Sequence, residues 1–231
     1  MPPQSLKTVF SELLLMLNIY LPRPDWFFGL DAGLEAFAGV IALLIAFASY
    51  KLYRSTGERS YKYFLVSFFL LGLSFLSRAV ADAFLGKVFF EAPAKVVAVL
   101  FFAGYAGHFF LALSAYILLV ASSFNIADKR LLVMLFLIMI PALLLSGSYF
   151  LSFYVISIIL LAFIAWAYFQ NFRKVGSVTS CLVFITFLLL TLAQPQFILD
   201  SLSDAWYVTA HATQALAYLV LLVAMLRILF K

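Results

Sequence analysis

Charged side chains are scarce in this chain of 231 residues: 11% are Asp, Glu, Lys or Arg, whereas 66% are hydrophobic. A soluble domain keeps about a quarter of its residues charged, because they cover the surface that faces water. With a mean hydropathy of +1.12, this chain cannot cover such a surface. The composition therefore predicts a multi-pass protein of the plasma membrane, with the lipid bilayer as its main partner.

Cysteine is almost absent, and recognisable enzyme motifs are missing. The single cysteine, Cys181, excludes a disulfide within the chain. The net charge of +5 is spread over loops rather than clustered beside aromatic residues, so we expect no nucleic-acid partner. The chain has no motif of hydrolases, kinases, phosphate-binding loops or metalloproteases, which argues against an enzyme.

Long apolar runs predict an all-α integral membrane domain of seven transmembrane helices over residues 25–231, because about 20 apolar residues cross a bilayer. The runs lie near 31–53, 62–85, 96–123, 131–146, 149–171, 178–199 and 206–229. The fourth run is short and contains Pro141, so we expect a kink or a smaller tilt there.

Residues 1–24 are too short and too interrupted to span. Apolar residues recur there at helical spacing, from Leu6 to Leu17, with polar residues on the other face. This pattern predicts an interfacial amphipathic helix that is stopped by Pro22 and Pro24.

The charges of the loops predict the orientation of the chain. Loop 51–62 carries four cations, and loops 124–130 and 172–177 carry two each. The loops on the other side hold mainly acidic residues, namely Asp25, Asp31, Glu91, Asp200 and Asp204. Because cytoplasmic loops are enriched in Lys and Arg, we expect the N-terminus outside and the C-terminus in the cytoplasm.

Two stretches of the chain resemble each other. HFFLALSAYILLVA begins at His108, HATQALAYLVLLVA begins at His211, and the two share the same residue at seven of fourteen positions. One interpretation is a 3+1+3 parallel repeat, in which two triplets of helices flank a central site. The alternative is the shared Leu- and Ala-rich composition, and both interpretations stay open.

Ionisable residues within the predicted spans are few and lie in the outer half. Such groups usually face the bundle interior or a wet cavity, because charge is costly at membrane depth. Arg78 and Asp82 are four residues apart and can pair on one helix face. Together with Glu35 they form either a ligand-binding charge cluster or an ion pair that only joins helices, and we weigh the two equally.

The only two histidines, His108 and His211, lie within the third and seventh predicted spans. Imidazole binds zinc or haem iron and senses protons. The favoured alternative is a neutral histidine that donates to a neighbouring helix. We therefore expect no cofactor, with metal ligation by these two residues as a weaker hypothesis.

The polar residues within the spans together predict a pocket that opens to the outside. Its candidate ligand-binding residues are Glu35, Arg78, Asp82, His108, Gln194, Gln196, His211 and Gln214. A separate feature is the pair of small residues Gly104 and Gly107 on the third span, which predicts close packing at the bundle centre.

Several seven-helix families are similar in layout. Pro195–Gln196 resembles the dipeptide of PQ-loop and SWEET transporters, although in those it belongs to the first helix of each repeat. Microbial rhodopsins hold retinal on a lysine of the last span, which has none here before Lys231, so we expect no retinal. Ceramidase-like hydrolases bind zinc with three histidines, whereas this chain has only two. In a similar site here, Asp82 would have to replace the third histidine.

The closest resemblance is to the seven-helix sensor regions of prokaryotic signalling proteins. It rests on the outward N-terminus, the basic loop YRSTGER (53–59) and the following FFLLGLSFLSRA (68–79). The resemblance implies a receptor-like module that binds a small ligand from outside and signals to a cytoplasmic partner. The alternatives are a small-solute transporter with pseudo-symmetric halves and a metal or haem protein that uses both histidines.

The predicted orientation can be tested with a reporter fused after Lys231. We expect activity typical of the cytoplasm, because seven spans and the loop charges place that end inside. A matched fusion in loop 51–62 should read the same compartment. An extracellular signal at Lys231 with a cytoplasmic signal in the loop would contradict the count of seven spans.

Overall fold

The computed structural model describes residues 25–27, 29–88, 94–126, 128–144 and 148–230. Over these residues the chain folds into seven α-helices and two short 3-10 helices. The elements are η1 (Asp25–Phe27), α2 (Leu30–Thr56), α3 (Arg59–Val88), α4 (Ala94–Ser123), α5 (Lys129–Leu144), α6 (Tyr149–Val175), α7 (Val178–Ile198), η2 (Leu199–Leu202) and α8 (Asp204–Leu229). The predicted interfacial helix over residues 1–24 lies outside the described residues.

Each predicted apolar run coincides with one of these α-helices, so the all-helical membrane class is confirmed. Six of the helices, α2, α3, α4, α6, α7 and α8, are long and apolar enough to cross a bilayer. The remaining helix, α5, has 16 residues and is about 24 Å long, which is shorter than a hydrocarbon core of about 30 Å. The chain is thus a multi-pass membrane protein with six long candidate spans and one shorter apolar helix.

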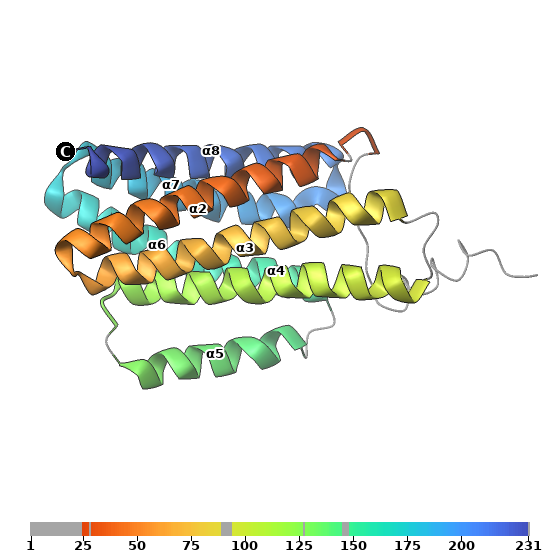
Figure 1. Cartoon of the computed structure of the whole chain (residues 1–231), viewed down its shortest axis with the longest axis horizontal. Helices are drawn as coiled ribbons and strands as arrows, with labels where there is room; N and C mark the ends of the chain where they lie inside the picture. Colours follow the sequence, from red (N-terminus) through yellow and green to blue (C-terminus); the bar gives the residue numbers. More distant parts are fainter. Residues whose placement is uncertain (1–24, 28, 89–93, 127, 145–147, 231) are drawn as a thin grey trace, which may run out of the picture.

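The six long helices pack in a closed ring. Helices α2, α3 and α4 pack in sequence, as do α6, α7 and α8, and the ring closes through the α2–α8 and α4–α6 contacts. Helix α5 lies along the outside, beside α4 and α6 (Figure 1). The helix axes run roughly parallel, so one end of the bundle holds the end of α8 and the other holds the start of α2 (Figure 1). We call these the C-terminal end and the N-terminal end of the bundle.

Tight turns join two helix pairs at the C-terminal end. Helix α2 stops at Gly57 and α6 stops at Gly176, with φ angles of 70° and 65°. The amide of each glycine bonds to the carbonyl four residues earlier, at 2.8 Å in both cases. Glycine adopts this left-handed geometry without the steric penalty of a Cβ, so each helix ends within one residue and the chain can reverse.

Small residues let neighbouring helices approach closely. A Cβ placed on Gly104 of α4 would lie 2.2 Å from the Cβ of Ala81 on α3. On the α2–α3 side, a Cβ on Gly39 or on Gly72 would lie 3.2 Å from the other glycine's carbonyl oxygen. The predicted close packing thus holds at Gly104, whereas Gly107 has nothing within 4 Å of such a Cβ.

The two glycines of α4 provide a matched test of this packing. Gly104→Ala should lower the thermal stability of the purified chain, because overpacking costs about 1–3 kcal/mol and the Ala81 Cβ cannot rotate away. Gly107→Ala should be neutral or stabilising, since both changes gain about 1 kcal/mol of helix propensity. Equal melting temperatures for the two variants in detergent would show that α3 and α4 do not approach at Gly104.

Candidate functional site

An ion pair is buried near the N-terminal end of the ring. Nε of Arg78 on α3 lies 2.7 Å from Oε1 of Glu35 on α2, and the two side chains expose 7% and 1% of their surface. Oδ2 of Asp82, one turn further along α3, lies 3.8 Å from the same nitrogen. The three charged residues that the sequence singles out are therefore one cluster, as predicted from their spacing and depth.

Tyrosines from other helices complete the surroundings of the ion pair. The hydroxyl of Tyr105 on α4 donates to Oδ1 of Asp82 at 2.6 Å, and its ring centre lies 5.5 Å from the Arg78 guanidinium carbon. Tyr154 on α6 also lies close to the guanidinium of Arg78. Hydrogen bonds and a cation–π contact stabilise a charged group that has lost its water. The cluster therefore ties α2, α3, α4 and α6 together.

Asp31 extends the cluster toward α8. Its Oδ1 accepts from the backbone amides of Gly29 and Ala32 at 2.9 and 2.8 Å, so it caps the first turn of α2. Its Oδ2 lies 3.4 Å from the hydroxyl of Tyr207, which donates to it. The loop charges counted Asp31 only among the acidic residues of the outer side; its side chain is fully buried and bridges α2 to α8.

His211 lies beside this bridge in an aromatic cage. The centre of its ring is 4.7 Å from that of Tyr207, 5.0 Å from Phe197 and 5.9 Å from Phe27. The residue is 3% exposed, and its Nε2 has no hydrogen-bond partner among the described residues. A buried polar atom without a partner is unfavourable, so Nε2 is a position where a bound water or ligand would be stabilised.

His108 is packed differently. The Ser74 hydroxyl donates to the His108 carbonyl at 2.9 Å, and its oxygen lies 2.7 Å from Nδ1 of the His108 ring. Since the one hydroxyl proton is used there, Nδ1–H of His108 donates to Ser74 Oγ. This is the helix-to-helix hydrogen bond that the favoured interpretation predicts for a membrane histidine.

The two histidine rings are linked through other aromatic rings. His108 packs on Phe153 and His211 packs on Phe197, and Tyr154 contacts both phenylalanines. Within the described residues, no three His, Cys, Asp or Glu side chains are grouped so that they could hold a metal ion. The combination of His108, His211 and Asp82 is therefore not assembled in this structure.

Two of the three predicted glutamines make hydrogen bonds to groups other than the ion pair. Gln194 is buried and its Nε2 donates to the Leu190 carbonyl of its own helix at 3.3 Å. Gln196 is half-buried and accepts from Thr213 at 3.3 Å, which joins α7 to α8. Gln214 is buried on α8, one turn after His211.

Four further residues of the cluster escaped the prediction: Asp31, Tyr105, Tyr154 and Tyr207. The sequence spacing could have identified two of them as inward-facing. Asp31 lies four residues before Glu35, and Tyr207 lies four residues before His211. Residues four apart share a helix face, so both would have pointed inward with their partners. Tyr105 and Tyr154 carried no such signal among the twelve tyrosines of the chain.

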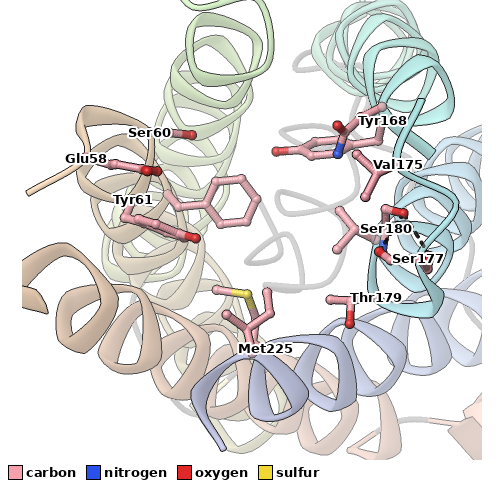
Figure 2. Close-up of a pocket in the computed structure, with 13 residues that line it drawn as sticks. Glu58, Ser60, Tyr61, Tyr168, Val175, Ser177, Thr179, Ser180 and Met225 are labelled. Carbon is pink, nitrogen blue, oxygen red and sulfur yellow. Dashed lines mark hydrogen bonds between the residues drawn. The ribbon is translucent and has the colours of Figure 1, made fainter. Parts of the chain in front are cut away.

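A second polar region lies at the C-terminal end of the bundle. A cavity of about 310 Å³ opens there between α3, α6, α7 and α8 (Figure 2). Its lining comprises Glu58, Ser60, Tyr61, Phe64, Tyr168, Asn171, Val175, Ser177, Thr179, Ser180, Val183, Met225 and Ile228. Helix α3 carries both regions, and the 14 residues from Phe64 to Arg78 separate them by about 21 Å.

The stretch of α3 between the two regions is closely packed and mainly apolar. Phe68, Leu71 and Phe75 all lie there and expose at most 2% of their surface. Phe75 makes an edge contact with Tyr218 of α8, with ring centres 5.4 Å apart. The bundle therefore has a charged layer, an apolar layer and a hollow layer along its axis.

Comparisons with known proteins provide no relative for this chain. No protein-family model matches it, no curated protein is similar to it, and no solved structure matches its fold. The resemblances to sensor regions and to PQ-loop and SWEET transporters stay predictions.

The buried ion pair makes a prediction about stability. Arg78→Gln should destabilise the chain by about 3–5 kcal/mol, because it leaves Glu35 and Asp82 in a low-dielectric site without the guanidinium. Arg54→Gln is the matched control, since Arg54 is exposed at the other end of the bundle and should change stability by less than about 0.5 kcal/mol. Equal thermal shifts for the two variants in detergent would contradict the pairing.

Proposed function

We propose that the chain is a receptor-like sensory module of the plasma membrane, with its N-terminal end outside. A small polar ligand binds at the charge cluster around Arg78, and the change in helix packing is signalled to a cytoplasmic partner. The observation that carries this proposal is the buried Arg78–Glu35 pair, whose Nε and Oε1 atoms lie 2.7 Å apart near the N-terminal end of the bundle. Ionisable groups at membrane depth are a recognised mark of a functional site.

The cluster suits a switch because it joins several helices at one point. Arg78 connects α3 to α2 through Glu35 and to α6 through Tyr154, while Asp82 connects α3 to α4 through Tyr105. A ligand that competes for the guanidinium or for a carboxylate changes these links together. A ligand shifts a conformational equilibrium only if it binds one conformation more tightly than the other. Binding at this cluster can do so, because the cluster's contacts differ between the two helix arrangements.

Helix α3 provides a direct route to the other end of the bundle. Its first turn carries Ser60 and Tyr61, which line the hollow layer, and it holds Arg78 and Asp82 near its far end. The hollow layer is where a shift in α3 would change the surface offered to a cytoplasmic partner. The exposed cations at this end, including Arg54 and Arg173 in the last turns of α2 and α6, favour a partner with acidic residues.

A small-solute transporter is the second candidate, and one observation favours it. The ring consists of two consecutive triplets, α2–α4 and α6–α8, with α5 outside. This is the arrangement expected of a 3+1+3 parallel repeat, whose halves could rock around a central site. His108 and His211 then occupy corresponding positions in the last helix of each triplet.

The two candidates can be separated in proteoliposomes with solutes of four classes: amino acids, carboxylic acids, sugars and amines. For a sensor, we expect one class to raise the melting temperature of the wild type and to change the labelling rate of Cys181, the single cysteine on α7, without crossing the membrane. Arg78→Gln should abolish both effects. Asp204→Asn, at an exposed position of the same end, should preserve them.

Two results would contradict the sensor. Flux of the stabilising solute into the liposomes would identify a transporter. Stabilisation that persists unchanged in Arg78→Gln and in Glu35→Gln would show that the ligand does not bind at the charge cluster.

A further inference from the structure

Two adjoining hollows occupy the C-terminal end of the bundle. The first, of about 310 Å³, lies between α3, α6, α7 and α8 (Figure 2). The second, of about 410 Å³, lies between α3, α4 and α6. Both are lined by Ser60, Tyr168 and Asn171, so they meet at these side chains. Each volume falls within the range of about 300–1,000 Å³ that is typical of small-molecule sites.

Tyr168 is the wall between the two hollows, and its ring is held in place. It stacks on Phe187 with ring centres 5.0 Å apart and an angle of 8°, and it meets the edge of Phe64 at 6.3 Å. On the far side, Ser60 of α3 and Ser122 of α4 are hydrogen-bonded at 3.0 Å. The junction is therefore formed by fixed groups on three different helices.

The first hollow has the chemistry of an ammonium site. Within the described part of the chain, its one charged lining residue is Glu58, and three aromatic side chains, Tyr61, Phe64 and Tyr168, line it as well. Figure 2 shows the phenol oxygens of Tyr61 and Tyr168 pointing into the hollow, on opposite sides. A carboxylate with aromatic rings attracts an organic ammonium group through charge and cation–π interactions.

The second hollow has the opposite character. Among the described residues, its one charged lining residue is Lys174, and the side-chain amides of Asn125 and Gln170 line it as hydrogen-bond donors. Ammonium, amide and hydroxyl donors are the groups that bind a carboxylate. Cations are expected at the cytoplasmic end of any membrane protein, but that rule does not place a carboxylate such as Glu58 beside them.

We propose that the paired hollows bind a zwitterionic solute of the amino acid or short peptide class. Its ammonium group lies in the first hollow toward Glu58, and its carboxylate lies in the second toward Lys174. The polar middle of the solute passes Ser60 and Asn171 at the junction. This site is separate from the charge cluster, since Arg78 lies about 21 Å further along α3 than Phe64. The proposal does not depend on the ligand of that cluster.

End-capped peptides test the two charges separately. The full chain in nanodiscs is titrated with trialanine, N-acetyl-trialanine and trialanine amide by calorimetry. We expect trialanine to bind and each cap to weaken the affinity by roughly two- to fivefold, because each cap removes one exposed ion pair.

Two variants assign each charge to its side chain. In Glu58→Gln, trialanine should bind as weakly as the acetylated peptide does to the wild type, and acetylation should have no further effect. In Lys174→Gln, trialanine should bind as weakly as trialanine amide binds to the wild type. Replacing the peptide's carboxylate by an amide should then cause no further loss of affinity in this variant. Both residues are exposed, so the variants should fold like the wild type.

Neighbouring charges provide matched controls. Arg173 and Asp128 are exposed at the same end and line neither hollow, so Arg173→Gln and Asp128→Asn should bind trialanine with unchanged affinity. The proposal is overturned if trialanine does not bind the wild type. It is overturned equally if both caps are tolerated, or if the control variants lose as much affinity as Glu58→Gln and Lys174→Gln.

Discussion

The burial of Arg78 is the constraint on which the N-terminal half of this bundle depends. A guanidinium removed from water and from lipid headgroups is stable only with a carboxylate and further hydrogen bonds close by. Glu35 meets the first need at 2.7 Å, and Asp82 and Tyr154 are its other polar neighbours. Helices α2, α3 and α6 must therefore meet at one level, and the register of the ring follows from that requirement.

Close helix packing makes this arrangement possible. Gly39 and Gly72 let α2 and α3 approach at their crossing, and Gly104 lets α4 approach α3 at Ala81. Larger residues at these points would separate the helices and lengthen the distances within the charge cluster. The close contacts between small residues therefore keep the charged groups within interaction distance. In lipid, van der Waals packing replaces the hydrophobic effect as the main attraction between helices.

The layers along the bundle give its two ends different chemistry. Aromatic side chains such as Tyr105 and Tyr207 pack around the charged layer, whereas the hollow layer opens at the C-terminal end of the bundle. Phe68, Leu71 and Phe75 of α3 lie between the two layers and are almost completely buried. A signal or a solute that passes from one layer to the other must displace this apolar packing, which makes α3 the element whose movement matters most for either proposed function.

The sequence by itself determined the helices and the orientation expected for them, because the length of an apolar run and the charge of a loop are local properties that the bilayer selects. The sequence also predicted that Glu35, Arg78 and Asp82 interact. Few charges lie at that depth, and an unpaired charge there would be costly. Only the tertiary structure decided that Asp31 is buried against Tyr207, that Tyr105 and Tyr154 complete the cluster, and that α5 lies outside the ring. It also decided that hollows form around Tyr168. These outcomes depend on which faces of different helices meet, and in a chain that is apolar on nearly every face the periodicity of a single helix does not specify its neighbours.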